Sequence, residues 1–181
     1  RNIISANLTY GINITAATST GNLIKGNYIG PSSALANIVG STQDYGVYII
    51  NSATTNRIGG SVAGEGNTIA FNSVDGIYLF NVAYTGNLIS RNLIYTNNNK
   101  KINLNYGANQ GNIGKAIPVI TTVTTTTVVG TSGASNIVEV FKNNGGACDD
   151  ATTFVGSVTA DASGNWSLGA ALAAGDQLVA T

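Results

Sequence analysis

The sequence feature that most constrains the fold is an internal repeat with an offset of 65 residues. The stretch Thr85–Tyr95, TGNLISRNLIY, occurs earlier as Thr20–Gly30, TGNLIKGNYIG. Laying residues 1–30 over residues 66–95 without a gap matches twelve positions. An ungapped match of this kind is typical of proteins built from stacked repeats.

The repeat divides further into three kinds of short strand that recur in a fixed order, and one circuit takes 25 to 40 residues. The first kind starts at Asn22, Asn56, Asn87 and Asn112; the second starts at Asn2, Asn27, Asn67 and Asn92; the third starts at Gly11, Gly46, Gly76 and Lys101. Antiparallel hairpins would need two-residue turns between like strands, whereas here a full circuit separates them. Three strands per circuit predict a right-handed parallel β-helix, in which each strand stacks on its counterpart in the next circuit.

The aliphatic residues of these strands predict the interior of the β-helix. Because side chains alternate between the two faces of a strand, one face of each strand should point inward. The predicted columns are Ile12/Ile14, Val47/Ile49, Ile77/Leu79 and Ile102/Leu104; Ile4, Ile29, Ile69 and Ile94; and Ile24, Ile58, Ile89 and Ile113.

The recurring asparagines predict ladders of side-chain amides along the stack. An amide both donates and accepts hydrogen bonds, so equivalent asparagines at a bend can bond to one another and to the backbone. The predicted ladders are Asn22, Asn56 and Asn87, and Asn2, Asn27, Asn67 and Asn92. The alternative is that these amides bind a metal or a sugar.

The sequence pattern changes after the repeat ends around residues 105–116. Strands are expected at Val119–Thr124, Thr126–Thr131, Ile137–Phe141, Phe154–Thr159, Trp166–Leu168 and Gln177–Thr181. Short strands at regular spacing with turn signals between them predict an immunoglobulin-like β-sandwich. The expected organisation is therefore all-β, with a β-helix over 1–116 and a sandwich over 117–181 that lacks its last strand and leaves an edge open.

Several phrases in the repeat resemble those of a known superfold. NLIKGNYIG, NRIGG and GNTIAFN are similar to the repeats of right-handed parallel β-helix proteins of the pectate-lyase-like superfold, in particular NosD-like and bacterial surface repeats. The later segment, with its Cys148-Asp149 and Asp161–Trp166 phrases, resembles an immunoglobulin-like module that follows such helices in large secreted bacterial proteins. This resemblance implies the fold; it leaves function open, because the superfold hosts enzymes, adhesins and spacers.

Charge and composition narrow the possible functions. The chain has no His, which excludes His-based triads and ordinary zinc sites. Residues 1–116 carry seven basic and three acidic side chains, and residues 117–181 carry one basic and five acidic side chains. This asymmetry could favour head-to-tail contact between copies, or the charges could simply be solvated. No apolar run is long enough to span a membrane, and no nucleic-acid partner is expected.

Enzymatic activity is not expected. Hydrolases of this fold use clustered carboxylates, but residues 1–116 contain only Asp44, Glu65 and Asp75, in which no retaining or inverting pair is visible. A polysaccharide lyase or hydrolase would need acids from outside this chain.

Two sites are candidates for ligand binding. Tyr48 and Tyr78 occupy equivalent outward positions in successive coils, with Tyr45 and Tyr10 nearby, and this strip could stack on sugar rings of a polysaccharide. The alternative is a cross-strand aromatic pair that only stabilises the sheet.

Asp149 and Asp150, with Asp161 or Glu139, could bind calcium, or could be solvated loop acids. No other cofactor is expected, and Cys148 is expected to be a free thiol or an intermolecular link.

The leading hypothesis is a structural or adhesive protein of the bacterial cell surface or extracellular space: a stalk, an adhesin or a fibre subunit. The chain opens in the middle of a repeat at Arg1 and has no Met, so it is expected to be a piece of a longer polypeptide. Its expected partners are copies of itself, arranged head to tail, or neighbouring domains, because an uncapped coil ordinarily needs a cap or a neighbour.

Overall fold

The computed structural model describes residues 1–40, 42–80, 86–104, 117–145 and 150–181. In these ranges all regular elements are β-strands, β1 to β17. The chain divides into two compact units, Arg1–Ile113 and Gly114–Thr181, here called the β-helix unit and the sandwich unit. The expected boundary after residue 116 adjoins residues 105–116, which lie outside the described residues together with the expected strand at Asn112 and the inward Ile113.

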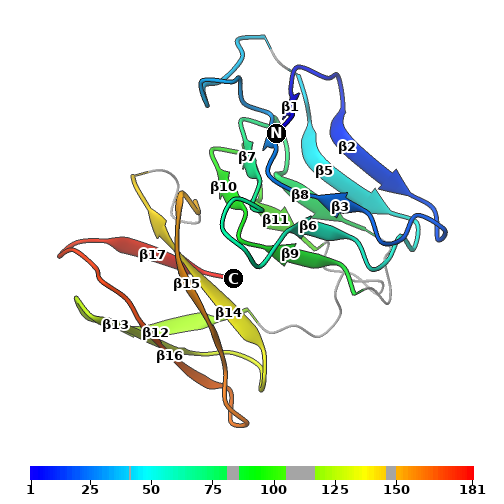
Figure 1. The fold of residues 1–181 in the computed structure, drawn as a ribbon. Coiled ribbons are helices and arrows are strands. Elements are labelled where there is room, and N and C mark those ends of the chain that lie inside the picture. The colour runs from blue at the N-terminus through cyan, green and yellow to red at the C-terminus, as the bar shows by residue number, and fades with distance from the viewer. Residues whose placement is uncertain (41, 81–85, 105–116, 146–149) are drawn as a thin grey trace. The chain divides into compact units, whose positions relative to one another are not determined.

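Three parallel sheets build the β-helix unit (Figure 1). The first sheet consists of β1 (Ile3–Ile4), β4 (Tyr28–Ile29), β7 (Thr68–Ala70) and β10 (Leu93–Tyr95). The second consists of β2 (Tyr10–Thr15), β5 (Tyr45–Ile50), β8 (Ile77–Leu79) and β11 (Ile102–Asn103), and the third of β3 (Leu23–Ile24), β6 (Arg57–Gly59) and β9 (Leu88–Ser90). Each strand pairs with its counterpart in the next coil, so the prediction of an all-β chain with a parallel β-helix is confirmed.

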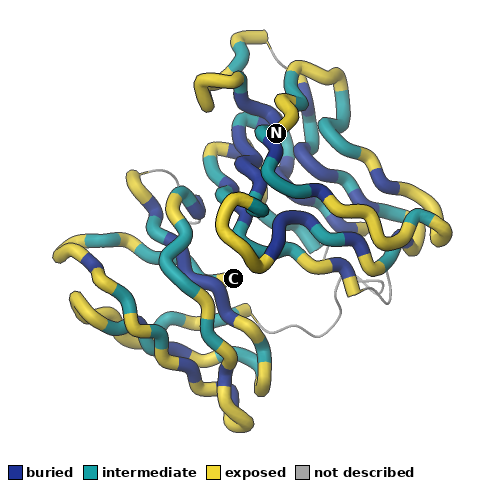
Figure 2. Tube along the Cα trace, viewed as in Figure 1, coloured by how far each residue is buried: buried dark blue, intermediate teal, exposed yellow. Residues whose placement is uncertain are grey.

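The register of the strands aligns the aliphatic side chains in inward columns. Ile4 pairs with Ile29, and Ile29 with Ile69, so one isoleucine lies above the next. The buried cluster contains expected residues of all three sheets and also Ala53, and five more of the expected residues are partly buried against it: Ile4, Ile12, Ile89, Ile102 and Leu104. Figure 2 shows the buried positions running along the inner side of the coils. Stacking therefore buries a continuous core that a single coil could not form.

The chain turns sharply before most of the asparagines at the corners between strands. Thr55, Phe71 and Arg91 precede such residues and have φ angles of 56°, 58° and 54°. The same left-handed conformation occurs at Gly21, Gly26, Gly86, Ala6 and Thr96. A left-handed conformation costs a residue with a side chain about 1–2 kcal/mol, so interactions at the corner must offset it.

Side-chain amides supply those interactions in two continuous ladders. In one ladder Asn22 donates to Asn56, and Asn56 to Asn87. The other runs from Asn2 through Asn27 and Asn67 to Asn92. At each step the backbone N–H and the Nδ2 group of one residue both donate to the Oδ1 atom of the next, as in Asn27 to Asn67 at 2.9 and 3.2 Å.

A third ladder was not anticipated from the sequence. Asn7 Nδ2 donates to Gln43 Oε1 at 3.0 Å, and Gln43 Nε2 donates to Asn72 Oδ1 at 2.7 Å. Asn72 then donates to Asn97 Oδ1 through both its backbone N–H and its Nδ2 group. The sequence does contain a sign of this ladder, because Asn7 and Asn72 match across the 65-residue repeat. The insertion 31–44 and the replacement of Asn by the longer Gln hide the second member.

The glycines that open the second sheet leave room for the third ladder. A Cβ atom on Gly46 would lie 2.5 Å from Ile69 Cγ2, 2.6 Å from the Gly76 carbonyl oxygen and 3.0 Å from Asn72 Nδ2. Equivalent collisions would occur at Gly11 and Gly76. These contacts are shorter than van der Waals distances, so the close approach of corner and core requires glycine here.

The sandwich unit consists of two antiparallel sheets. One contains β12 (Val119–Val123), β13 (Thr127–Thr131) and β16 (Asn165–Gly169); the other contains β14 (Ile137–Asn143), β15 (Thr153–Thr159) and β17 (Gln177–Ala180). All six expected strands are present. Both sheets contribute to one core, in which Trp166 packs over Gly130 and joins Val128, Val138 and Val140.

Replacing Asn67 by Ala should strongly destabilise the β-helix unit. The Asn67 side chain is fully buried and makes four hydrogen bonds: it accepts two from Asn27 and donates to Asn92 Oδ1 and to the Ile24 carbonyl. Asn67→Ala leaves buried polar groups without partners, and we expect a loss of about 3 kcal/mol or more in the free energy of unfolding. Denaturant unfolding followed by circular dichroism measures this loss.

The matched control is Asn22→Ala at the exposed end of a ladder. This change removes the Nδ2 bond to Asn56 while the backbone N–H of residue 22 still donates to Asn56. We expect a loss of about 1 kcal/mol or less. Equal losses for the two variants would contradict a structural role for the buried ladder.

Candidate functional site

Four tyrosines gather on the outer side of the second sheet and form what is here called the tyrosine stack: Tyr10, Tyr45, Tyr48 and Tyr78. The strand register brings them together, since Tyr10 pairs with Tyr45 and Tyr48 pairs with Tyr78. Asn13 and Asn103 pair with the two ends of the Tyr48–Tyr78 column, as the sequence suggested. All four rings are partly exposed.

Each ring of the tyrosine stack contacts at least two others. Tyr48 lies at the centre: its ring centroid is 4.6 Å from that of Tyr10, 4.9 Å from Tyr45 and 5.1 Å from Tyr78. The Tyr48 and Tyr78 rings are nearly parallel, with 5° between their planes. The Phe80 ring, which is 43% exposed, extends the row beyond Tyr78 at 6.1 Å. The four tyrosine rings therefore pack against one another.

The stack raises the pKa of two of its phenols. Burial is the main cause of the raised pKa of Tyr45, and Asp75 is the next, because a nearby carboxylate disfavours a phenolate. Burial also raises the pKa of Tyr48, followed by the neighbouring tyrosines, including a side-chain hydrogen bond with Tyr10. Both groups thus remain neutral phenols to a higher pH than an ordinary tyrosine.

The three carboxylates of the β-helix unit are engaged in bonds between coils. Asp75 is buried and accepts hydrogen bonds from Asn99 Nδ2, the Lys100 backbone N–H and Asn103 Nδ2. Asp44 accepts one from the Ser73 hydroxyl at 2.7 Å.

Glu65 holds the 60–66 insertion against the preceding coil. Its Oε1 atom lies 2.7 Å from Lys25 Nζ, and the hydrogen bond from Lys25 is the main cause of the lowered pKa of Glu65. The Glu65 carbonyl also accepts a hydrogen bond from the Gly26 backbone N–H at 3.0 Å.

The acids proposed for calcium binding are only partly described. Asp149 and Cys148 lie outside the described residues, and Asp150 is buried. The Asp161 carboxylate accepts hydrogen bonds from the backbone N–H groups of Ser163 and Asn165, which lowers its pKa and forms the turn before β16. Within the described ranges no three His, Cys, Asp or Glu side chains are placed to hold a metal ion. Calcium binding stays a prediction.

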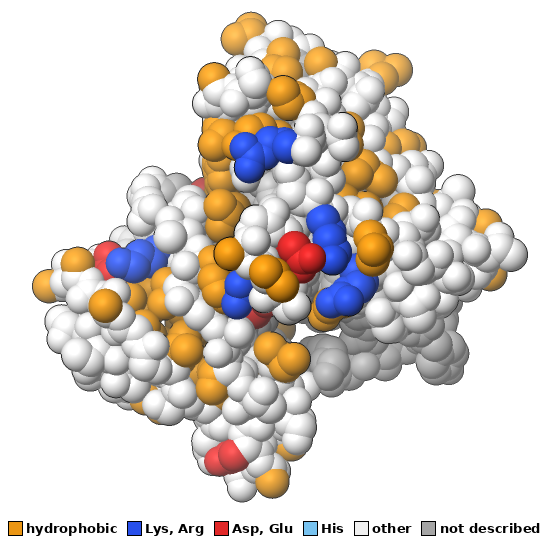
Figure 3. Space-filling view, in the orientation of Figure 1, with side chains coloured by type: hydrophobic (Ala, Val, Ile, Leu, Met, Phe, Trp, Pro, Cys, Tyr) orange, Lys and Arg blue, Asp and Glu red, His pale blue; other side chains and the backbone are white. Residues whose placement is uncertain are grey.

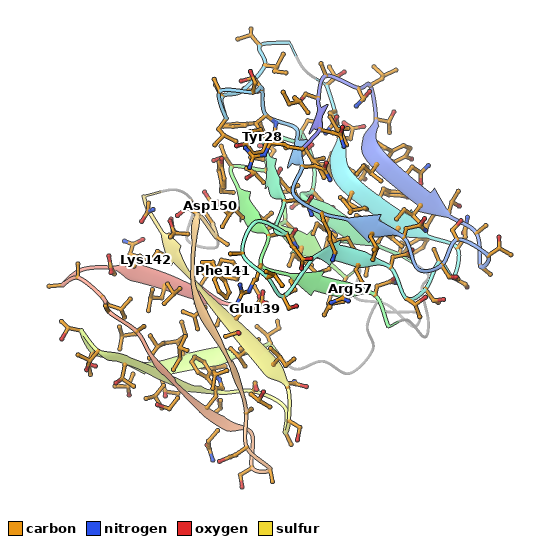
Figure 4. The ribbon with its side chains drawn as sticks, in the orientation of Figure 1. Tyr28, Arg57, Glu139, Phe141, Lys142 and Asp150 are labelled. Atoms are coloured by element: carbon orange, nitrogen blue, oxygen red, sulfur yellow. The ribbon has the colours of Figure 1, made fainter. Side chains whose placement is uncertain are left out.

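The outer face of the third sheet carries an apolar column interrupted by an arginine. Leu23, Arg57 and Leu88 pair in register, and the two leucines are 62% and 40% exposed. Figure 4 labels Arg57, the first residue of β6, and its Nε atom is buried with no hydrogen-bond partner among the described residues. Figure 3 shows that charged side chains cover little of the visible surface.

No protein-family model matches the chain, and no curated protein matches it. In the part of the chain that the structure describes, no helix is long and apolar enough to cross a membrane.

Alkaline pH should weaken the β-helix unit through the tyrosine stack. Because the pKa values of Tyr45 and Tyr48 are raised above 10.0 in the folded state, folding retains protons that the unfolded chain releases. The stabilisation is therefore complete below about pH 10 and is lost as pH rises through the folded pKa values. Unfolding free energies measured in denaturant at pH values on both sides of 10 check this, with ultraviolet absorbance reporting phenolate formation.

Tyr48→Phe keeps the ring and removes one titrating group. We expect a shallower fall in stability at alkaline pH in this variant than in the wild type. Identical slopes in the two proteins would contradict a contribution from Tyr48.

Proposed function

We propose that this chain is a structural or adhesive module of a secreted or cell-surface bacterial protein: a stalk, an adhesin or a fibre subunit of the β-helix class that the NosD-like and surface repeats represent. The observation that carries this proposal is the set of three amide ladders. They run parallel to the stacking direction, and at every step one side-chain amide donates to the next.

Because each ladder continues through the same kind of amide-to-amide hydrogen bond, the β-helix can be lengthened by adding coils. Adding a coil adds one amide to each ladder and one strand to each sheet, so length increases without any new kind of interaction. The carboxylates of the unit support the same role, since Asp44, Glu65 and Asp75 all form bonds between coils.

The partner that fits this module is another coil. Strands β1, β2 and β3 are the outermost strands of the three sheets. A preceding coil of a longer chain or a second copy of this chain would continue each sheet by pairing with them. The basic excess of residues 1–116 and the acidic excess of residues 117–181 favour a head-to-tail arrangement of copies.

Negative-stain microscopy of the purified chain tests assembly. We expect filaments built from units of 18.4 kDa. Leu23→Lys places a charge on the outer face of edge strand β3 and should leave single particles, because lysine on an edge discourages strand pairing. Val39→Lys makes the same kind of change at a 97% exposed residue of the 31–44 insertion and should still form filaments.

Single particles from the wild-type chain at every concentration would exclude self-assembly. The rod would then serve as a spacer within a longer polypeptide, and neighbouring domains would be its partners. Filaments that persist in Leu23→Lys would show that assembly uses another surface.

A second candidate function is polysaccharide binding at the tyrosine stack. Partly exposed phenols, the exposed Phe80 ring and the flanking amides of Asn13 and Asn103 provide apolar edges beside hydrogen-bonding groups, a combination that suits sugars. The contacts among the rings favour the alternative, an aromatic cluster that stabilises the sheet.

Affinity electrophoresis in gels containing neutral or acidic polysaccharides separates these two roles. Binding should retard the wild-type chain and not Tyr48→Ala/Tyr78→Ala, provided that circular dichroism shows the variant to be folded. Equal mobility in all gels, together with a lower melting temperature of the variant, would leave only the stabilising role.

A further inference from the structure

We propose that the tyrosine stack is a site of oxidative crosslinking, where Tyr10 and Tyr48 couple to form a dityrosine that joins the first coil covalently to the second. The proposal rests on the geometry of the stack and is independent of the proposed function.

Tyr10 and Tyr48 are the closest pair of rings in the stack. Their centroids are 4.6 Å apart and their planes are tilted by 37°. Their parent strands β2 and β5 are hydrogen-bonded neighbours, with Tyr10 opposite Tyr45 and Asn13 opposite Tyr48. The sheet therefore holds the two rings together without any movement of the backbone.

The relative orientation of the two rings also fits the product. In a dityrosine the new bond joins the ring carbons next to the two hydroxyl groups, so the hydroxyls are neighbours and the rings are tilted about that bond. The planes of the Tyr10 and Tyr48 rings are tilted by 37°, and the Tyr10 phenol is among the causes that raise the pKa of Tyr48. A tilt between the two ring planes is therefore already present in the folded protein.

The Tyr10–Tyr45 and Tyr45–Tyr78 centroids are farther apart, at 5.9 and 5.4 Å, and two closer contacts suit coupling less well for other reasons. Tyr48 and Tyr78 lie face to face with 5° between their planes, so one ring would have to rotate before an edge carbon could reach its partner. Tyr45 and Tyr48 belong to the same strand and are tilted by 56°, and a link between them would not join two coils.

The reaction needs a one-electron oxidant, for which we name a peroxide-activated haem peroxidase. Each phenol loses one electron and its hydroxyl proton, which gives two phenoxyl radicals. The radicals combine by forming a carbon–carbon bond between the ring positions beside the oxygens. Each ring then releases the hydrogen at that position as a proton and regains its hydroxyl hydrogen, so the protein loses two hydrogen atoms and peroxide is reduced to water.

The crosslink would fasten an outermost strand of the second sheet. Strand β2 has only β5 as a neighbour in that sheet, so β2 depends on one set of backbone bonds. A covalent bond between residues 10 and 48 closes a loop of the chain and reduces the entropy of the unfolded state. The first coil should then separate from the second less readily.

Peroxidase and hydrogen peroxide, applied to dilute folded protein, test the proposal directly. Trypsin separates the candidate partners, because Tyr10 lies in the peptide 2–25, Tyr48 in 26–57 and Tyr78 in 58–91. We expect dityrosine fluorescence in the monomer, a mass lower by two hydrogen atoms, and a linked pair of the first two peptides with fragment ions that place the bond at Tyr10 and Tyr48.

Two variants and one condition complete the test. Tyr48→Phe keeps the ring, and the fluorescence and the linked peptides should fall to the level of unoxidised protein. Tyr28 lies in the same tryptic peptide as Tyr48 but is not part of the tyrosine stack, so Tyr28→Phe should leave the product unchanged. Oxidation in denaturant should abolish the preference for this pair.

Three outcomes would overturn the proposal. These are a dominant link between peptides 26–57 and 58–91, crosslinks found only between molecules, and the same mixture of products from folded and denatured protein. Because the experiment uses monomeric protein, it gives an answer whether or not the chain forms filaments or binds a polysaccharide.

Discussion

The β-helix unit depends on the hydrogen bonds of side-chain amides inside its corners. An amide buried without partners costs several kcal/mol in the free energy of folding, whereas one whose donors and acceptors are all paired does not. Asn67 illustrates the solution, since all four of its hydrogen-bonding sites are used and two of its three partner residues, Asn27 and Asn92, are equivalent asparagines in adjacent coils. Each amide is therefore satisfied only because the next coil is present.

This dependence explains why stacked coils are stable although a single coil is not. The left-handed corners at Thr55, Phe71 and Arg91 are unfavourable in isolation, and the amide that follows each corner holds it in place. Position 46 must also be glycine, because any larger residue would collide with the core isoleucine Ile69 and with Asn72 of the third ladder. Stacking of the coils therefore offsets the local strain and the cost of burying polar groups, and it forms the apolar core at the same time.

The tyrosine stack follows from the same geometry on the outer side of the sheet. Equivalent outward residues in successive coils are spaced by the distance between strands, about 4.8 Å, which is close to the distance at which aromatic rings stack. Tyr48 and Tyr78 meet in this way, and Tyr10 and Tyr45 join them from the bend before the glycines. Burial in this cluster raises the pKa of Tyr45 and of Tyr48; Asp75 adds to the effect at Tyr45, and the neighbouring phenols add to it at both.

Much of this architecture was determined by the sequence alone. The repeat predicted the order of the strands, the alternation of residues predicted the inward columns, and asparagine at equivalent bends predicted two of the three ladders, because each of these depends on local pattern and constant spacing. The tertiary structure decided what depends on contacts between coils. Gln43 enters the third ladder across an insertion of irregular length, and the tyrosine rings pack against one another. Sequence spacing fixes which residues share a face, but the hydrogen-bond partners of a side chain and the tilt of a ring are set only when the neighbouring coil is in place.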